Sequence, residues 1–303
     1  MRTTKRFTPQ LLRRWNEIGR GSGTGDEYSP WHQVSRGDPA SRGRSHLLAR
    51  PGSRRFTNLL SDGELTALFF AQMLPDVIDI TEQYPLAFET TPHELSRYSV
   101  CFLGKSCEGT AKIAADLGIK HPVIYCRGDR ESWTPSTDLV VVRSTDGICS
   151  LVTIAVKQIE EIQKRRTEQL LNLEREYWLR RGAQWLLITP AQYDSRVGLT
   201  LSRTAPWAFS RCRANKAQQV ACAKIVKACE GRTFVRILEE LEVGLNLITL
   251  HAQCAFWQSV WNGIIPLDLR LGHRSNELVQ LLSHDDFIAL NPIRAGRSAW
   301  PNS

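Results

Sequence analysis

Apolar and polar positions alternate along the first two thirds of the chain with spacings that define separate helices and strands. Helical spacing is clearest in one group of large side chains, Leu65, Leu68, Phe69 and Met73. Ser61 precedes this group, and Glu64 follows three residues later, which is the pattern of a helix capping box. We therefore predict a helix over residues 61–74, and a shorter one over residues 8–18.

Several apolar runs have the length and the β-branched content of strands. They cover residues 77–86, 123–126, 137–142, 147–156 and 185–189. Asp146-Gly147 is a strong signal for a hairpin turn between the third and fourth runs. Residues 158–181 carry an amphipathic pattern that predicts one long helix, with Gly182 at its end. A hairpin, a helix and a further strand are typical of an α/β domain with a mixed sheet.

The two ends of the chain differ from this middle part in composition and in the spacing of their apolar residues. Glycines between residues 19 and 25 and prolines at positions 30, 39 and 51 predict an extended basic arm within residues 1–58. Residues 215–260 have helical spacing again, with these residues as the predicted core: Val220, Ile225, Ile237, Leu241, Leu245, Ile248 and Leu250. We therefore predict two domains, 1–195 and 196–303, of which the second is smaller and mostly helical.

Composition narrows the class of protein. The formal net charge of +8 favours a polyanionic partner, and nucleic acid is the first candidate. No run of 18 apolar residues predicts a membrane span, and no apolar stretch follows the basic start, so we expect the chain in the cytoplasm. None of the eight cysteines forms a C-x-x-C pair, so we expect reduced thiols and no zinc knuckle.

Four charged residues could carry chemistry, namely Glu64, Asp138, Lys157 and Glu174. Each has an ordinary reading as a helix cap, a strand end or one of many charges on a helix face. Their order is more informative, because Asp138 opens one strand of the predicted hairpin and Lys157 closes the next. This is the layout of PD-(D/E)-x-K nucleases, in which carboxylates hold Mg²⁺ or Mn²⁺ and an ammonium stabilises developing negative charge.

An ordered set of motifs resembles the TnsA family of heteromeric transposases. The motifs are Tyr28-Ser29-Pro30-Trp31, Ser41-Arg42-Gly43-Arg44-Ser45-His46, Leu59-Leu60-Ser61-Asp62-Gly63-Glu64, the run 77–86, Thr137-Asp138, Ala155-Val156-Lys157 and Leu173-Glu174-Arg175-Glu176-Tyr177-Trp178. The resemblance spans roughly residues 10–190 and is weaker beyond. A series of motifs in family order is much more specific than any one of them.

The resemblance implies a restriction-endonuclease-like catalytic domain that cuts the 5′ strand at each transposon end with Mg²⁺ or Mn²⁺. It makes Glu64, Asp138 and Lys157 the catalytic residues and Glu174 a further metal-proximal acid. It also implies a winged-helix-like C-terminal domain that engages the ATPase TnsC, and a separate transposase, TnsB, for the 3′ strand. The expected location is then the nucleoid, on double-stranded DNA.

The chain departs from the family pattern at Ala155, where Gln or Glu usually stands two residues before the lysine. Ala155 offers no side-chain oxygen, so one metal ligand is missing. Either the carbonyl of Val156, a water or Glu174 replaces it, or the site is weak or disabled. A catalytically weak subunit that binds DNA and bridges partners is therefore the alternative function, and a stand-alone restriction-type nuclease is a third one, which leaves the arm motifs unexplained.

The basic arm has two interpretations as well. Arg42, Arg44 and His46 either contact DNA phosphates or belong to a solvated loop, and we favour phosphate contacts. Trp31 is interpreted as a packing anchor rather than a platform for base stacking.

Overall fold

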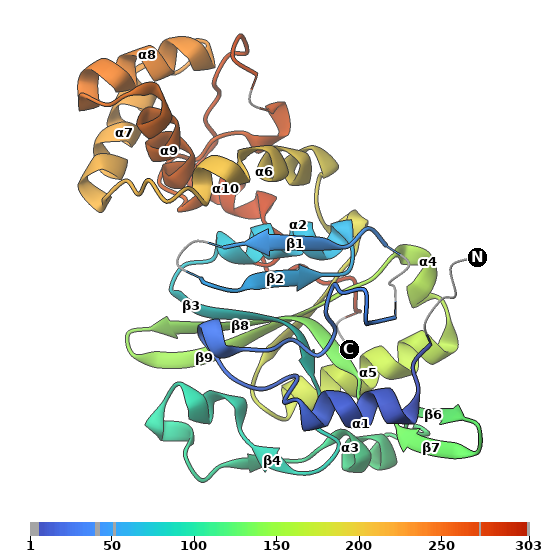
Figure 1. Cartoon of the computed structure of the whole chain (residues 1–303). Coiled ribbons are helices and arrows are strands. Elements are labelled where there is room, and N and C mark those ends of the chain that lie inside the picture. The colour runs from blue at the N-terminus through green and yellow to red at the C-terminus, as the bar shows by residue number, and fades with distance from the viewer. Residues whose placement is uncertain (1–5, 40–42, 51–52, 273, 302–303) are drawn as a thin grey trace. The chain divides into compact units, whose positions relative to one another are not determined.

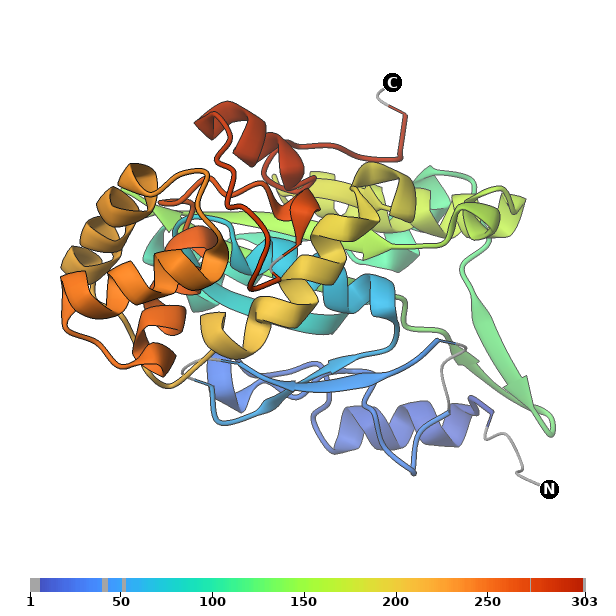
Figure 2. The ribbon, with the colours of Figure 1, turned by 90° about the horizontal axis from the view of Figure 1, so that it is seen from above.

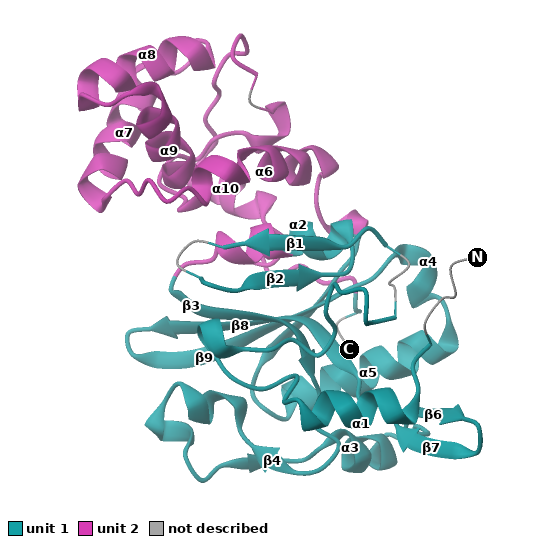
Figure 3. Cartoon of the chain, in the orientation of Figure 1, with its two compact units in different colours: residues 1–67, 76–189, 300–303 teal, residues 68–75, 190–299 magenta. Residues whose placement is uncertain are grey.

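The computed structural model describes residues 6–39, 43–50, 53–272 and 274–301. The chain forms two compact units, which Figure 3 distinguishes by colour. Unit 1 comprises residues 1–67, 76–189 and 300–303, and unit 2 comprises residues 68–75 and 190–299. Both units are therefore assembled from separate segments. The functional division between residues 1–195 and 196–303 stays a prediction.

A four-stranded mixed sheet forms the centre of unit 1, with the strand order β10-β9-β8-β3 (Figure 1). Its strands are β3 Val77–Pro85, β8 Ser136–Thr145, β9 Ile148–Val156 and β10 Gln184–Ile188. β8 is antiparallel to both β3 and β9, whereas β10 is parallel to β9. Asp146 and Gly147 turn the β8–β9 hairpin with φ values of 51° and 79°, as a type I′ turn requires. The predicted mixed sheet and its turn are confirmed.

Helices flank this sheet in unit 1. They are α3 Thr110–Asp116, α4 Ile159–Ile162 and α5 Arg165–Leu179, together with the first residues of α2 Asp62–Gln72. α5 packs against β10 and α3. The single helix predicted over 158–181 is wrong, because Lys164 has an extended backbone that separates α4 from α5. Ile159 is exposed, so the first turn lacks the core contact that the periodicity implied.

The N-terminal segment is more ordered than predicted. α1 Pro9–Glu17 confirms the short helix, but β1 His46–Ala49 and β2 Phe56–Leu59 form an antiparallel hairpin where an extended arm was expected. The prediction missed it because the pairing partners lie on either side of Pro51 and neither strand alternates strongly. Trp31 is 1% exposed and packs with Trp15, so its interpretation as a packing anchor is confirmed.

Two further short ribbons belong to unit 1. β4 Thr91–Pro92 pairs with β5 Ser106–Cys107, and β6 Val123–Cys126 pairs with β7 Asp129–Ser132. The β6–β7 hairpin projects beside α1, as both the front view and the view from above show (Figure 2). Arg13 of α1 donates to Asp129 and Glu131 of this hairpin at 2.8 Å each.

Helices make up most of unit 2. They are α6 Ser195–Ala208, α7 Lys216–Ala228, α8 Phe234–Leu245, α9 Thr249–Trp261 and α10 His284–Leu290, and they confirm the helical prediction. Of the predicted core, Ile237 and Leu241 are buried. Val220 of α7 is exposed, and so are Ile248 and Leu250, which lie at the start of α9, whose buried face begins at Ala252. The winged-helix character stays a prediction.

Among the described residues, no helix combines the length and the apolar character needed to cross a bilayer.

Candidate nuclease site

Asp138 and Lys157 meet at one end of the β8–β9 hairpin. The register pairs Leu139 with Ile154, so the acid at the start of β8 lies opposite the residues that end β9. Asp138 Oδ2 accepts from the amide of Val156 at 2.7 Å and from Lys157 Nζ at 3.1 Å. Lys157 Nζ also donates to the carbonyl of Val156 at 2.9 Å. The predicted pairing of acid and ammonium is therefore present.

Several carboxylates act on this ammonium. Burial works against its charge, but the negative charges of Asp138 and Glu174 outweigh burial and hold the pKa of Lys157 above its ordinary value. The side chain remains 28% exposed, so the ammonium can still meet a ligand. Lys157 is a fixed positive charge at neutral pH and cannot serve there as a base.

Glu64 lies in the first turn of α2, where the Ser61 half of the predicted capping box is present and the Glu64 carboxylate accepts from the Leu60 amide instead of the Ser61 amide. Ser61 Oγ accepts from the amide of Glu64 and donates back to Glu64 Oε1, both at 3.1 Å. Glu64 Oε2 accepts from the amide of Leu60 at 2.8 Å and from Gln83 Nε2 at 2.9 Å. Glu64 therefore caps the helix and also belongs to the candidate site.

The protonation of Glu64 is unusual for a cap. Burial, together with the nearby charge of Asp138, raises the pKa of Glu64 to about 8. The Leu60 amide and the Lys157 ammonium oppose this rise only in part. Glu64 and Asp138 therefore lie close enough for their charges to repel, although they come from different elements.

Glu174 comes from α5 and is buried. Its Oε1 accepts from Thr137 Oγ1 at 2.8 Å and from the Trp185 indole at 3.4 Å. Burial raises the pKa of Glu174 to about 7, while Lys157 lowers it and Asp138 raises it. A third acid is thus brought near the Asp138–Lys157 pair. Perturbed carboxyl groups gathered in one place are a common property of active sites.

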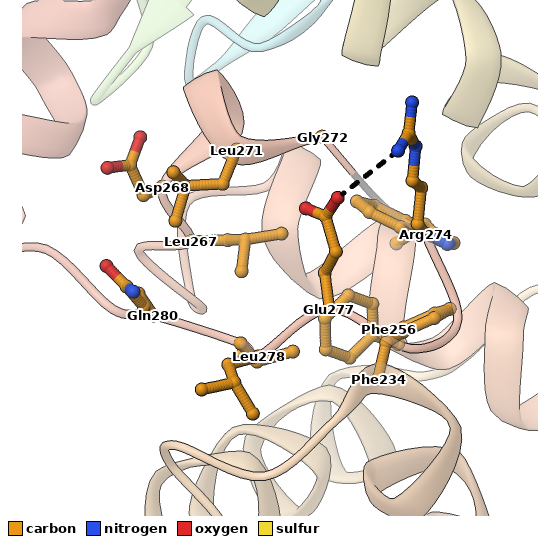
Figure 4. A pocket seen from close by; sticks show the side chains of 12 residues that line it. Phe234, Phe256, Leu267, Asp268, Leu271, Gly272, Arg274, Glu277, Leu278 and Gln280 are labelled. Atoms are coloured by element: carbon orange, nitrogen blue, oxygen red, sulfur yellow. Dashed lines mark ion pairs between the residues drawn. The ribbon is translucent and has the colours of Figure 1, made fainter.

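Asp138, Lys157 and Glu174 border one cavity of about 550 Å³ in unit 1. A cavity of this size can hold part of a substrate. A second hollow, in unit 2, is drawn in Figure 4, where Arg274 and Glu277 form an ion pair at its mouth. That hollow has room for only about 20 Å³, which suits a water molecule and no substrate.

Gln83 is the site residue that the sequence analysis did not single out. It has a φ of 49°, a conformation that costs energy for a residue other than glycine. Its side chain donates to Glu64 and borders the cavity, and its carbonyl accepts from the amide of Trp31 at 3.2 Å. The neighbouring Glu82 is fully buried and bound by Arg55. The motif that the family resemblance used, 77–86, was the available signal.

Ala155 has no exposed surface, and it pairs in register with Leu187 of β10. The alanine side chain does not border the cavity, whereas Glu174 does. Of the alternatives for the missing ligand, the geometry favours Glu174, whose carboxylate already interacts electrostatically with Lys157 and Asp138.

The residues expected to contact DNA are placed only in part. Arg42 lies outside the described residues. Arg44 is exposed just before β1, and His46 begins β1, where its Nε2 lies 2.7 Å from Asp62 Oδ1. Neither residue borders the cavity. Their role in binding phosphates stays a prediction.

The donor set suits a hard cation, although a complete cage is not present. Glu64, Asp138, Glu174 and the Val156 carbonyl offer only oxygen, and repulsion between the acids is what a cation would relieve. Within the described ranges, no three His, Cys, Asp or Glu side chains lie together as a metal site. Mg²⁺ is commonly held by one or two carboxylates with water and substrate phosphate, so these residues fit it in that manner.

Two comparisons with known proteins bear on this site. Residues 74–190, which contain Asp138, Lys157 and Glu174, match the family described as "TnsA-like endonuclease N terminal". The chain is also 30% identical over 286 residues to the transposon Tn7 transposition protein TnsA of Escherichia coli. That match covers 90% of each chain, so it includes Glu64 and most of unit 2.

Proposed function

Because the chain belongs to the TnsA family and is thus a transposon-related endonuclease, we propose that it hydrolyses the 5′-strand phosphodiester at each transposon end, using Mg²⁺ or Mn²⁺. The observation that carries the proposal is the Asp138–Lys157 pair at the mouth of a cavity shared with Glu174. This arrangement combines cation ligands with a fixed ammonium, which phosphodiester hydrolysis requires.

Each residue has a role that follows from its contacts. Asp138, Glu64 and the Val156 carbonyl would hold the cation, and Glu174 would supply the oxygen that Ala155 lacks. When bound, the cation would supply charge neutralisation at the phosphate and lower the pKa of a water. Lys157, which remains protonated, would bind the scissile phosphate and stabilise the charge that develops on it.

The N-terminal unit would meet double-stranded DNA at the transposon ends through its basic residues. Arg44 is exposed and His46 is half-buried beside Asp62, and we propose that both contact phosphates near the cut. Arg42 belongs to the same predicted contact. Phosphate contacts of this kind make binding depend on salt rather than on sequence.

Unit 2 would bind the TnsC-type ATPase, while a TnsB-type transposase would cut the 3′ strand. A groove of about 530 Å³ in unit 2 supports a docking role. Its floor includes Val220, Ile265 and Leu282, and Lys224 and Lys227 lie beside them. An apolar floor with adjacent lysines suits a partner segment that is apolar and acidic.

Ala155 supports a second candidate, a catalytically weak subunit that binds DNA and bridges its partners. Both candidates share the family, the basic arm and the docking groove. They differ only in whether the site formed by these acids cleaves DNA.

A cleavage assay with matched acids separates these two candidates. Asp138→Ala removes a predicted metal ligand, whereas Glu89→Ala removes an exposed acid that does not border the cavity. The assay contains the partner subunits. We expect Asp138→Ala to lose 5′ cleavage at transposon ends and Glu89→Ala to retain it. Equal cleavage by both variants, with circular dichroism spectra like that of the parent protein, would favour the bridging subunit.

A further inference from the structure

The cavity at the nuclease site has a second wall that the proposed chemistry does not use. Phe7, His32 and Trp133 border it, as do Leu170 and Leu171 of α5. The three rings pack on one another, with centroids 4.8 Å apart for Phe7–Trp133, 5.6 Å for Phe7–His32 and 5.8 Å for His32–Trp133. They come from three distant parts of the chain and form one continuous aromatic surface.

This aromatic wall is rigidly supported. Trp15 of α1 packs edge-on against both Phe7 and His32, at 5.9 Å and 5.3 Å, and is itself almost fully buried. Arg20 stacks over the Trp15 ring at 4.5 Å and forms an ion pair with Asp38. A wall held by such packing keeps its shape before a ligand arrives, which lowers the cost of binding.

The wall carries no positive charge. Burial lowers the pKa of His32 to about 4, although Asp38 and Asp138 oppose this, so the imidazole is neutral at physiological pH. Four acids and one ammonium border the whole cavity, namely Asp38, Asp138, Glu161, Glu174 and Lys157. A phosphate would therefore be attracted only to the Lys157 side. The aromatic side suits a flat and uncharged group with polar edges.

From this juxtaposition we infer that the aromatic wall of Phe7, His32 and Trp133 receives one unstacked nucleobase next to the scissile phosphate. The inference rests on the proposed function, since the DNA strand must already lie at Lys157. Aromatic rings stack with any base, and a pocket lined by such rings is how enzymes that modify a base hold it outside the helix. Gln33 and Thr167 border the same space and could pair with the polar edge of the base. The volume of about 550 Å³ accommodates a nucleoside.

Extrusion of a base gives a signature that phosphate binding lacks. A mismatch removes part of the cost of unpairing, so a protein that extrudes one nucleotide binds more tightly when that nucleotide is mismatched. The test uses the full chain with the partner transposase, and transposon-end duplexes with a single mismatch placed in turn at each position around the 5′ cut. We expect one position beside the cut to give at least about fivefold tighter binding.

Two variants connect this gain to the cavity. Leu170 lines the cavity but is not one of the stacked rings, so Leu170→Trp should occupy the space for the base and abolish the gain from the mismatch. Tyr125→Ala removes an exposed ring of β6 outside the cavity and should retain the gain. Thermal unfolding of each variant verifies its fold. Trp133→Ala removes one ring of the aromatic wall and should also abolish the gain in binding from the mismatch.

The experiment distinguishes failure of the proposed base pocket from failure of the proposed nuclease function. Cleavage of the 5′ strand without any sensitive mismatch position would overturn the base pocket and leave the nuclease standing. A mismatch gain that survives in Leu170→Trp would also overturn it. A gain that depends on Leu170, in a protein that does not cut, would support the pocket and contradict the nuclease.

Discussion

Replacing Glu64 with glutamine should stabilise the metal-free protein at alkaline pH. The folded-state pKa of Glu64 is about 8, whereas its ordinary value is 4.5, so folding favours the protonated carboxyl. Between these two values the folded state binds more protons than the unfolded state, and stability falls as the pH rises. The stability from this group is fully present below pH 4.5 and is lost above about pH 8. Glutamine cannot ionise, so the variant avoids this loss.

The size of the effect follows from the same two values. Their difference, at about 1.4 kcal/mol per pH unit, gives roughly 5 kcal/mol at the alkaline limit. For a unit of this size, 1 kcal/mol moves the Tm by about 2–4 °C, so the parent protein should lose about 10 °C between pH 5 and pH 9 through Glu64. Asp138 and Lys157, the charged groups that act on Glu64, are present in both proteins.

The assay is thermal unfolding of both proteins in EDTA from pH 5 to pH 9, with Glu89→Gln as a control at an exposed acid. The Tm of the glutamine variant should exceed that of the parent above pH 8 and should match or fall below it at pH 5. Mn²⁺ at pH 8 should raise the Tm of the parent and raise that of the variant less, since Glu64 would hold the ion. Parallel curves for parent and variant would refute both the buried charge repulsion and its relief by metal.

Three further predictions concern other parts of the molecule. Glu174→Gln should keep the hydrogen bond from Thr137 and the binding of DNA. It should reduce 5′ cleavage at least about tenfold, because the carboxylate that compensates for Ala155 is lost. Unchanged cleavage would mean that no side chain needs to compensate for Ala155. Arg55→Met should leave the fully buried Glu82 without its ion pair and destabilise the protein by about 3–5 kcal/mol in urea unfolding, whereas the exposed Arg232→Met should change little. Lys224→Glu in the groove of unit 2 should weaken capture of the TnsC-type partner without lowering DNA binding, while the exposed Arg236→Glu of α8 should not.

The part of the site that could be predicted is the part set by local structure. Asp146-Gly147 fixes the β8–β9 hairpin, and the hairpin alone brings Asp138 opposite the end of β9 and Lys157. Glu64 was visible as a cap because its partner Ser61 lies three residues away. These features depend on turn chemistry and on short-range hydrogen bonds, which a sequence displays directly.

The remaining features depend on pairings between distant segments. Gln83 holds Glu64 only because β3 passes beside the start of α2, and its positive φ has no glycine or asparagine to signal it. The aromatic wall joins Phe7, His32 and Trp133, which lie up to 126 positions apart. The break at Lys164 has no proline to mark it. Periodicity describes one element at a time, so it cannot give contacts of this kind.

The most direct test of the central claim is a map of the 5′ cut. Transposon-end duplexes labelled on either strand are incubated with the full chain and its partner transposase, in Mg²⁺ and in EDTA. The account predicts a 5′-strand cut at each end that requires Mg²⁺, is lost in Asp138→Ala and is retained in Glu89→Ala. A cut on that strand that persists in EDTA or in Asp138→Ala would contradict it.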